Sequence, residues 1–228
     1  MPLRTVYRRA LKRGDVMLNP TLGLELPALE GKRDRVASPA EAGKLLAALA
    51  EADRPLWACA FYGGLRMGEL RALDWSAVDL AAGIIRVLHS WDRVEGLVEP
   101  KSKKSKRTVA IPSILRGYLV EHRKRRFALG QRTGFVFGET PESPFNYDVT
   151  YDRALRIWKA AKLEPVCLHE CRHTYVTLMF EAGLSLEEIG DYVGHNSAYM
   201  TDRYRHLREG HEARAAERFD AYLARAGN

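Results

Sequence analysis

The stretch VCLHECRHTYVT, residues 166–177, places two cysteines, two histidines and an arginine within seven positions. Such residues can build either a zinc site or a phosphate site. The apolar residues that follow, up to a glycine, predict a helix that begins within this stretch. On a helix, residues three or four positions apart share a face, so Cys167 pairs with Cys171. In the same way, His169 pairs with His173.

A zinc site would need these two pairs to point toward one centre. A step of two residues turns about 200° around a helix axis, so the pairs diverge. The third cysteine, Cys59, lies in the apolar run LWACAFYGG and adds no second cluster. We therefore favour a phosphate site, with His169 and Arg172 as hydrogen-bond donors facing DNA and with Cys167 and Cys171 facing the core. An isolated His-x-x-Arg is common on helix surfaces, so partners elsewhere are needed.

Composition limits the class of protein. The chain has 228 residues, 46% of them hydrophobic, which is enough for one well-buried core. It contains no apolar run of about 18 residues and no secretory signal, so we expect a cytoplasmic protein without a membrane segment. Three cysteines without framework spacing fit a reducing compartment. The net charge of +7 and a pI near 9.4 favour a polyanionic partner, either nucleic acid or an anionic membrane surface.

The hydrophobic pattern predicts a mainly α-helical chain with one small antiparallel β-sheet inserted early, an α+β fold. The strands are expected in GIIRVLHS, GLVEPKS and KRTVAIP, which begin at residues 83, 96 and 106. Ser38, Pro39 and Glu41 predict a helix start with a capping box. Helices are also expected at residues 3–14, 67–73, 113–128, 147–162, 185–193, 198–207 and 211–226.

A first partner for the phosphate site lies in GGLRMGEL, residues 63–70. Arg66 follows two glycines at an expected helix entry, where both backbone and guanidinium can approach an anion. Glu69, three residues later, can share the face of Arg66 and steady it. The alternative for this pair is an ordinary ion pair on a helix surface.

A second partner lies in the expected hairpin PKSKKSKRTVAIP, which Lys101 opens. A flexible cationic finger suited to the DNA backbone is predicted from its neighbours, Lys103, Lys104, Lys106 and Arg107. The alternative is a lysine-rich turn that only aids solubility.

The last candidates lie near the C-terminal end. His195 stands at a turn in YVGHNS, and Tyr204 follows nine residues later between Arg203 and Arg205. Neighbouring positive charge favours the phenolate of a tyrosine. Because the ordinary tyrosine pKa is near 10, a nucleophilic tyrosine needs such help or a proton acceptor. Tyr199 is the nearest alternative nucleophile.

The chain resembles the tyrosine recombinases, the phage-integrase family of site-specific DNA recombinases, in five motifs. In chain order these motifs are GLRMGEL, the lysine of a hairpin, HECRHT, GH and TDRY. These motifs span residues 63–206. The resemblance implies catalytic roles for Arg66, Lys101, His169, Arg172, His195 and Tyr204. Lys103 remains the alternative to Lys101, since both belong to one flexible loop.

The resemblance also implies an activity. The chain would cleave and rejoin DNA strands through a 3′-phosphotyrosyl intermediate, without a metal, a nucleotide or another cofactor. Its partners would be double-stranded DNA at a recombination site, further copies of the chain in a tetramer, and accessory DNA-bending proteins. The alternatives are a DNA-binding regulator, a truncated integrase without recombination activity of its own, and a type IB topoisomerase, which uses similar chemistry.

The resemblance suggests a domain plan as well. Residues 1–27 resemble the last helix and exit of the family's N-terminal core-binding domain, and residues 28–37 would be a linker. Residues 38–228 would form the catalytic domain, with a last helix at 209–226 that docks onto a neighbouring protomer. Most of the core-binding domain is missing from this sequence, so we expect either an excised catalytic fragment or a naturally shortened gene.

Overall fold

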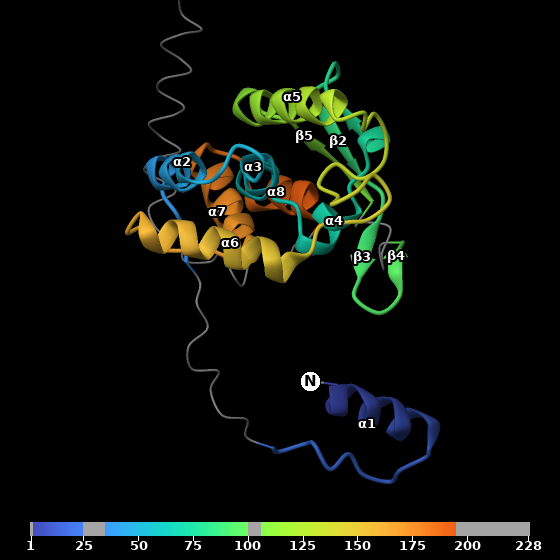
Figure 1. Cartoon of the computed structure of the whole chain (residues 1–228). Helices are drawn as coiled ribbons and strands as arrows, with labels where there is room; N and C mark the ends of the chain where they lie inside the picture. The colour runs from blue at the N-terminus through green and yellow to red at the C-terminus, as the bar shows by residue number, and fades with distance from the viewer. Residues whose placement is uncertain (1, 25–34, 100–105, 195–228) are drawn as a thin grey trace, which may run out of the picture. The chain divides into compact units, whose positions relative to one another are not determined.

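The structure, a computed structural model, divides the chain into two compact units, Met1–Arg33 and Asp34–Asn228. The division falls inside the expected linker, and the assignment of the first unit to a core-binding domain stays a prediction. The structure describes residues 2–24, 35–99 and 106–194 (Figure 1).

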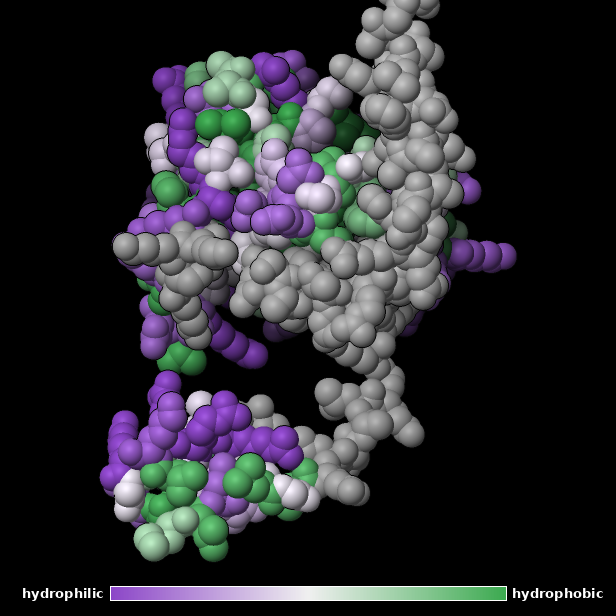
Figure 2. Space-filling view, turned by 180° about the vertical axis from the view of Figure 1, so that it is seen from behind, coloured by the Kyte–Doolittle hydropathy of each residue, from purple (hydrophilic) through white to green (hydrophobic). Residues whose placement is uncertain are grey.

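The first unit contains α1, Pro2–Arg13, within one residue of the expected helix. Its apolar side chains Leu3, Val6 and Leu11 are exposed, and its last turn carries Lys12 and Arg13. Figure 2 shows the hydrophobic residues of this unit gathered on one side and the hydrophilic residues on another. The helix is therefore amphipathic.

The second unit contains the remaining helices, and their order follows the prediction. A 3₁₀ turn at Trp75–Ala77 follows α4. None of the described helices is long and apolar enough to cross a membrane. The helices expected at residues 198–207 and 211–226 lie outside the described residues. The bounds are α2 Pro39–Ala48, α3 Arg54–Gly63, α4 Met67–Ala72, α5 Ser113–Ala128, α6 Tyr147–Ala160, α7 Leu168–Glu181 and α8 Leu186–Val193.

The start of α2 corrects one detail of the prediction. Ser38 is the N-cap, and its hydroxyl accepts a hydrogen bond from the Glu41 backbone N–H at 3.2 Å, as expected. The Glu41 carboxylate binds Arg35. The expected capping box is therefore half formed, because the arginine that precedes the helix attracts the carboxylate more strongly than a neutral N–H does.

The predicted α+β fold with antiparallel strands is confirmed, but the strands of the described residues form two small sheets where one was expected. β2 pairs with β5, with Ile85 opposite Val109 and Val87 opposite Arg107, and β1 pairs with the other edge of β2. The second sheet is the β3–β4 hairpin, which projects from the body in Figure 1. The bounds are β1 Val78–Asp79, β2 Ile84–Val87, β3 Ser90–Asp92, β4 Gly96–Val98 and β5 Arg107–Ala110.

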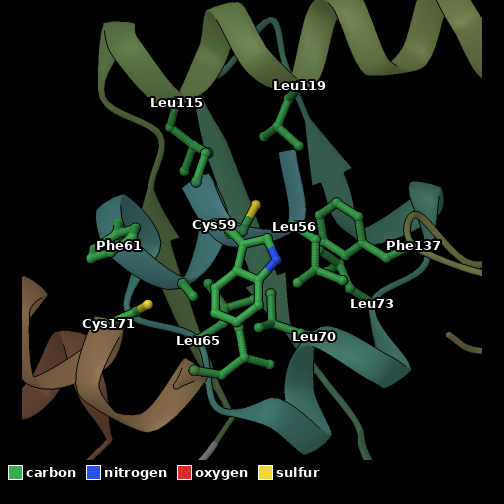
Figure 3. Close-up of a cluster of buried hydrophobic side chains, with 14 of the residues drawn as sticks. Leu56, Cys59, Phe61, Leu65, Leu70, Leu73, Leu115, Leu119, Phe137 and Cys171 are labelled. Atoms are coloured by element: carbon green, nitrogen blue, oxygen red, sulfur yellow. The ribbon is translucent and has the colours of Figure 1, made fainter. Parts of the chain in front are cut away.

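The core surrounds α3, because nearly every residue of this helix is buried. Figure 3 shows Leu115 and Leu119 projecting from α5 toward Cys59 on α3, with Cys171 of α7 nearby. The rings of Trp57 on α3 and Trp158 on α6 meet edge to face with centroids 4.8 Å apart. An apolar helix with α5 and α7 packed against it gives a rigid frame for the turn that follows α3.

Candidate active site

The turn between α3 and α4 begins at Gly64, which ends α3 in the left-handed conformation with a φ of 60°. Glycine adopts this conformation without the crowding that a side chain causes. A Cβ at this position would lie 2.2 Å from Cδ1 of Tyr175, so α3 and α7 approach closely here. The tight helix entry predicted from the two glycines is present, and it places Arg66 at the N-cap of α4.

Glu69, in the first turn of α4, holds Arg66 in two ways. Its Oε2 accepts a hydrogen bond from the Arg66 backbone N–H at 2.8 Å, and its Oε1 accepts one from Arg66 Nη1 at 2.8 Å. The Glu69 side chain is only 6% exposed, whereas that of Arg66 is 35% exposed. The contact predicted between these residues is present, and the burial of the carboxylate contradicts the alternative of an ordinary surface pair.

Arg172, from the first half of α7, approaches the same carboxylate. Its Nη1 lies 4.0 Å from Glu69 Oε2, and its guanidinium donates hydrogen bonds to the carbonyl oxygens of Gly64 and Val193. Its side chain is 2% exposed. Two arginines that lie far apart in the sequence therefore meet around one carboxylate. Arg172 is buried, whereas His169 is exposed, and the expectation that both side chains face DNA stays a prediction.

Arg107 is a third arginine in this cluster, and here the structure corrects the sequence analysis. We expected it in a flexible cationic finger, but its side chain is 5% exposed. Its Nη1 and Nη2 donate to Glu69 Oε1 and Oε2, both at 2.8 Å. Lys106, the preceding residue, is exposed and pairs with Glu99 at 3.1 Å. A buried guanidinium needs a carboxylate partner, so Arg107 belongs to the interior cluster.

The electrostatics of Glu69 follow from these contacts. Burial by itself raises the pKa of the Glu69 carboxyl, but the hydrogen bonds and charge of Arg107, with the charges of Arg172 and Arg66, lower it to about 2. Glu69 is therefore ionised at neutral pH. Within the described residues, three guanidiniums surround this one carboxylate, which makes the cluster a place that attracts anions.

The C-terminal end of α8 closes the cluster. Arg107 Nε donates to Tyr192 O at 2.6 Å, Arg172 donates to Val193 O, and Arg66 Nη2 donates to Gly194 O at 3.0 Å. The last carbonyls of a helix lack intrahelical partners and carry partial negative charge, so cations stabilise them. All three arginines thus hold the chain at the point from which His195 continues.

The start of α7 carries the remaining described candidates. The His169 ring meets that of His173 edge to face with centroids 4.3 Å apart, which confirms that the two histidines share a face. Cys171 is fully buried, as expected, whereas Cys167 is half-buried at the N-cap. Burial raises the pKa of both thiols. Among the described residues, no group of three or more side chains could hold a metal ion.

Tyr175 is the described tyrosine that packs against the turn before Arg66. Burial raises its pKa to about 12, although Arg107 and Arg172 act in the opposite direction. A phenol with so high a pKa is a poor nucleophile at neutral pH. The Tyr175 ring packs against Gly64, and Tyr204 stays the predicted nucleophile.

The other predicted site residues lie outside the described residues. They include the proposed nucleophile, the proposed general acid and the arginines beside the nucleophile. Their roles stay predictions. These residues are Lys101, Lys103, Lys104, His195, Arg203, Tyr204 and Arg205.

The chain is similar to known recombinases in sequence. It is 27% identical to a tyrosine recombinase XerC-like protein of Caldanaerobacter subterraneus subsp. tengcongensis, in a match covering 94% of this chain and 63% of that protein. It is also 27% identical to the ICEBs1 integrase of Bacillus subtilis, over 96% of this chain and 61% of that protein. The chain thus spans less than two thirds of the length of these relatives.

The fold is also that of solved recombinases. The Tn1549 transposon integrase in complex with a circular intermediate DNA matches 87% of this chain and 71% of its own, with a TM-score of 0.72 and 18% identity. XerA recombinase matches 88% of this chain and 71% of its own, with a TM-score of 0.62 and 22% identity. The model of the phage integrase family matches residues 35–211. With most of its length matched, and with the arginines of two of its motifs gathered around one carboxylate, the chain belongs to the phage integrase family.

Proposed function

We propose that this chain is a site-specific DNA recombinase that cleaves and rejoins DNA through a covalent phosphotyrosyl intermediate. The observation that carries the proposal is the meeting of Arg66 and Arg172 around Glu69. Family membership supports it, because relatives include recombinases and integrases. Two solved relatives are bound to DNA, the Tn1549 integrase and a lambda integrase dimer on a COC′ core site.

In the proposed reaction, the Tyr204 oxygen attacks a backbone phosphorus, and the bond from phosphorus to the 5′ oxygen breaks. The products are a 3′-phosphotyrosyl ester and a free 5′-hydroxyl. Lys101 protonates the leaving oxygen, a role that suits a mobile ammonium better than a fixed guanidinium. His169 assists proton transfer with Tyr204. Because the ester keeps the energy of the broken bond, resealing needs no nucleotide.

The arginine cluster would supply charge stabilisation in this reaction. Negative charge grows on the non-bridging oxygens as the tyrosine attacks, and preorganised donors stabilise it. Arg66 and Arg172 would donate to those oxygens and take the part that a metal ion has in other phosphoryl-transfer enzymes. His195, which follows directly from the end of α8, would add a hydrogen bond to a phosphate oxygen.

Partners are part of the proposal. Double-stranded DNA at a recombination site would be the substrate, and the lysines between β4 and β5, with Arg203 and Arg205, would contact its backbone. The chain would act as a tetramer on DNA, with the expected helix at 209–226 docking onto a neighbour and accessory proteins bending the DNA. Affinity should fall steeply with salt, because counterions are released from the phosphates.

A suicide DNA substrate, whose nicked strand releases the 5′-hydroxyl fragment after cleavage, tests the proposal. Denaturing electrophoresis should show the chain covalently attached to DNA, in the presence of a metal chelator. The variant Tyr204→Phe should give no adduct, whereas the matched control Tyr199→Phe should give one. An adduct formed by Tyr204→Phe would contradict the assigned nucleophile.

Three other outcomes would favour an alternative. DNA binding by the wild-type chain without any adduct would favour a DNA-binding regulator, or an integrase that needs further sequence for activity. Relaxation of a supercoiled plasmid without strand exchange between two sites would favour a topoisomerase. Activity lost in chelator and restored by zinc would contradict the metal-independent mechanism.

A further inference from the structure

Arg107 occupies an unusual place for the first residue of an edge strand. It begins β5, directly after the lysine-rich loop, and lies opposite Val87 of β2. Val109, two residues further, is fully buried on the inner side of this sheet. Side chains two positions apart on a strand point to the same face, so the register directs Arg107 inward.

The contacts of Arg107 use the whole guanidinium fork. Two nitrogens bind the two carboxylate oxygens of Glu69 at 2.8 Å each, and Nε binds the carbonyl of Tyr192 at 2.6 Å. A bidentate pair fixes the orientation of both partners, which a lysine ammonium cannot do. Glu69 in turn holds both the backbone and the side chain of Arg66. Arg107 therefore connects Arg66 to the end of α8 through direct hydrogen bonds.

We propose that Arg107 is a positioning residue of the active site, which orients Arg66 through Glu69 and holds the C-terminal end of α8. It acts through other residues and is not assigned a contact with DNA. The inference rests on the proposed function, because the segment after α8 carries His195 and Tyr204.

The charged groups around Glu69 determine how its pKa should change when Arg107 is replaced. Arg107 reaches Glu69 from β5, Arg66 from the start of α4 and Arg172 from α7. The phenol of Tyr175 interacts with Arg107 and Arg172, and also with the phenol of Tyr192. Without Arg107, burial still opposes ionisation of Glu69 and one strong hydrogen-bonding partner is gone. The pKa of Glu69 should then rise, and the carboxylate should release Arg66 at a pH at which the wild type still holds it.

The experiment compares Arg107→Gln and Arg107→Lys with the matched control Arg86→Gln. Arg86 lies on neighbouring β2, is exposed, and stands 3.9 Å from Asp79. We expect Arg107→Gln to slow covalent capture of suicide DNA by about 100-fold, with DNA binding changed by less than about threefold, because misplacement affects the reacting geometry most. The rate of covalent capture by Arg107→Gln should also fall as the pH decreases, over a range in which the wild-type rate stays constant. Arg107→Lys should be intermediate, since it keeps the charge without the fork.

A second measurement needs no activity. The Glu69 carboxyl is titrated by ¹³C NMR in the wild type, Arg107→Gln and Arg86→Gln, each shown to be folded by circular dichroism. A raised Glu69 pKa in Arg107→Gln alone supports the positioning role. The same capture rate, pH profile and Glu69 titration in Arg107→Gln as in Arg86→Gln would overturn it. A wild-type chain that forms no adduct would instead contradict the proposed function, and the titration would still decide the role of Arg107.

Discussion

Two ion clusters in this chain have similar hydrogen-bond lengths and opposite surroundings. Arg153 on α6 binds Asp53 with contacts of 2.5 and 2.7 Å; the Arg153 side chain is 45% exposed and that of Asp53 is 11% exposed. Arg107 binds Glu69 with two contacts of 2.8 Å, and both side chains are buried. Contact distance alone would make the two pairs equivalent. The difference in burial distinguishes them, because charges interact far more strongly away from water. The buried pair of Arg107 and Glu69 is therefore the one that can hold a site in place.

The neighbours of each pair extend this contrast. Asp53 and Arg153 join two helices at the surface, where solvent screens their attraction. Glu69 is shared by three arginines from three different elements, and the same arginines hold the last carbonyls of α8. Removal of the Asp53 charge from the surface pair leaves Arg153, which is 45% exposed, as a solvated charge. Removal of one partner from the buried cluster leaves charges without compensation.

Glu69→Ala should have the largest effect. It leaves the guanidiniums of Arg66, Arg107 and Arg172 close together without their carboxylate. We expect a loss of about 3–5 kcal/mol in the free energy of unfolding. Urea denaturation followed by circular dichroism measures it. A loss below about 1 kcal/mol would mean that the buried cluster is no more important than a surface pair.

Acid should weaken the buried cluster over a defined range of pH. The pKa of Glu69 is lowered to about 2 in the folded chain from an ordinary value of 4.5, so its contribution is fully present above the ordinary pKa and is lost as pH falls toward 2. At roughly 1.4 kcal/mol per pKa unit, this amounts to about 3–4 kcal/mol. Urea midpoints measured from pH 6 to pH 2 test it. Glu69→Gln should lack this part of the acid dependence, and an unchanged dependence would contradict the prediction.

Gly64→Ala tests whether the cluster depends on the close approach of α3 and α7. An alanine must adopt a φ of 60°, and its Cβ would lie 2.2 Å from the Tyr175 ring. We expect a loss of about 1–3 kcal/mol in stability, together with slower covalent capture. Gly83→Ala is the matched control, because Gly83 also has a positive φ, of 69°, but no neighbouring atom within 4 Å of its Cβ position. Equal losses in the two variants would show that only the backbone conformation matters.

Asp53→Asn should have the smallest effect. An exposed pair contributes about 0–1 kcal/mol, and added salt should reduce the difference from the wild type. Urea denaturation at low and high ionic strength measures it, with covalent capture expected to stay at the wild-type rate. A loss comparable to that of Glu69→Ala would remove the contrast between the two clusters.

Most of the helices could be predicted because their signals are local. Ser38 as an N-cap, the glycines before Arg66 and the apolar spacing of α5 and α6 each act within a few residues. The contact between Arg66 and Glu69 is also local, since three residues separate them on one helical turn. The family motifs could therefore be recognised before any packing was known.

The prediction that Arg107 is exposed is wrong, although the sequence contains a signal for its burial. Its place at the end of a lysine run predicts exposure, as for the lysines that precede it. The alternation of Arg107, Val109 and Ile111 along the strand would have placed the arginine on the buried face with the two apolar residues. Pairing of β2 with β5 could not be derived from the strands alone, because an antiparallel strand can pair with any neighbour of compatible pattern.

The sequence by itself determined the family, the order of the helices and the turn that presents Arg66, because these depend on residues close together in the chain. Only the tertiary structure decided that Arg66, Arg107 and Arg172 share Glu69 and hold the end of α8. That arrangement requires β5 to pair with β2 and α7 to pack against α3, and such pairing depends on shape and burial across the whole core. Burial alone raises the pKa of the Glu69 carboxyl, and the three arginines lower it. The ionised cluster therefore forms only where the elements that carry these arginines meet.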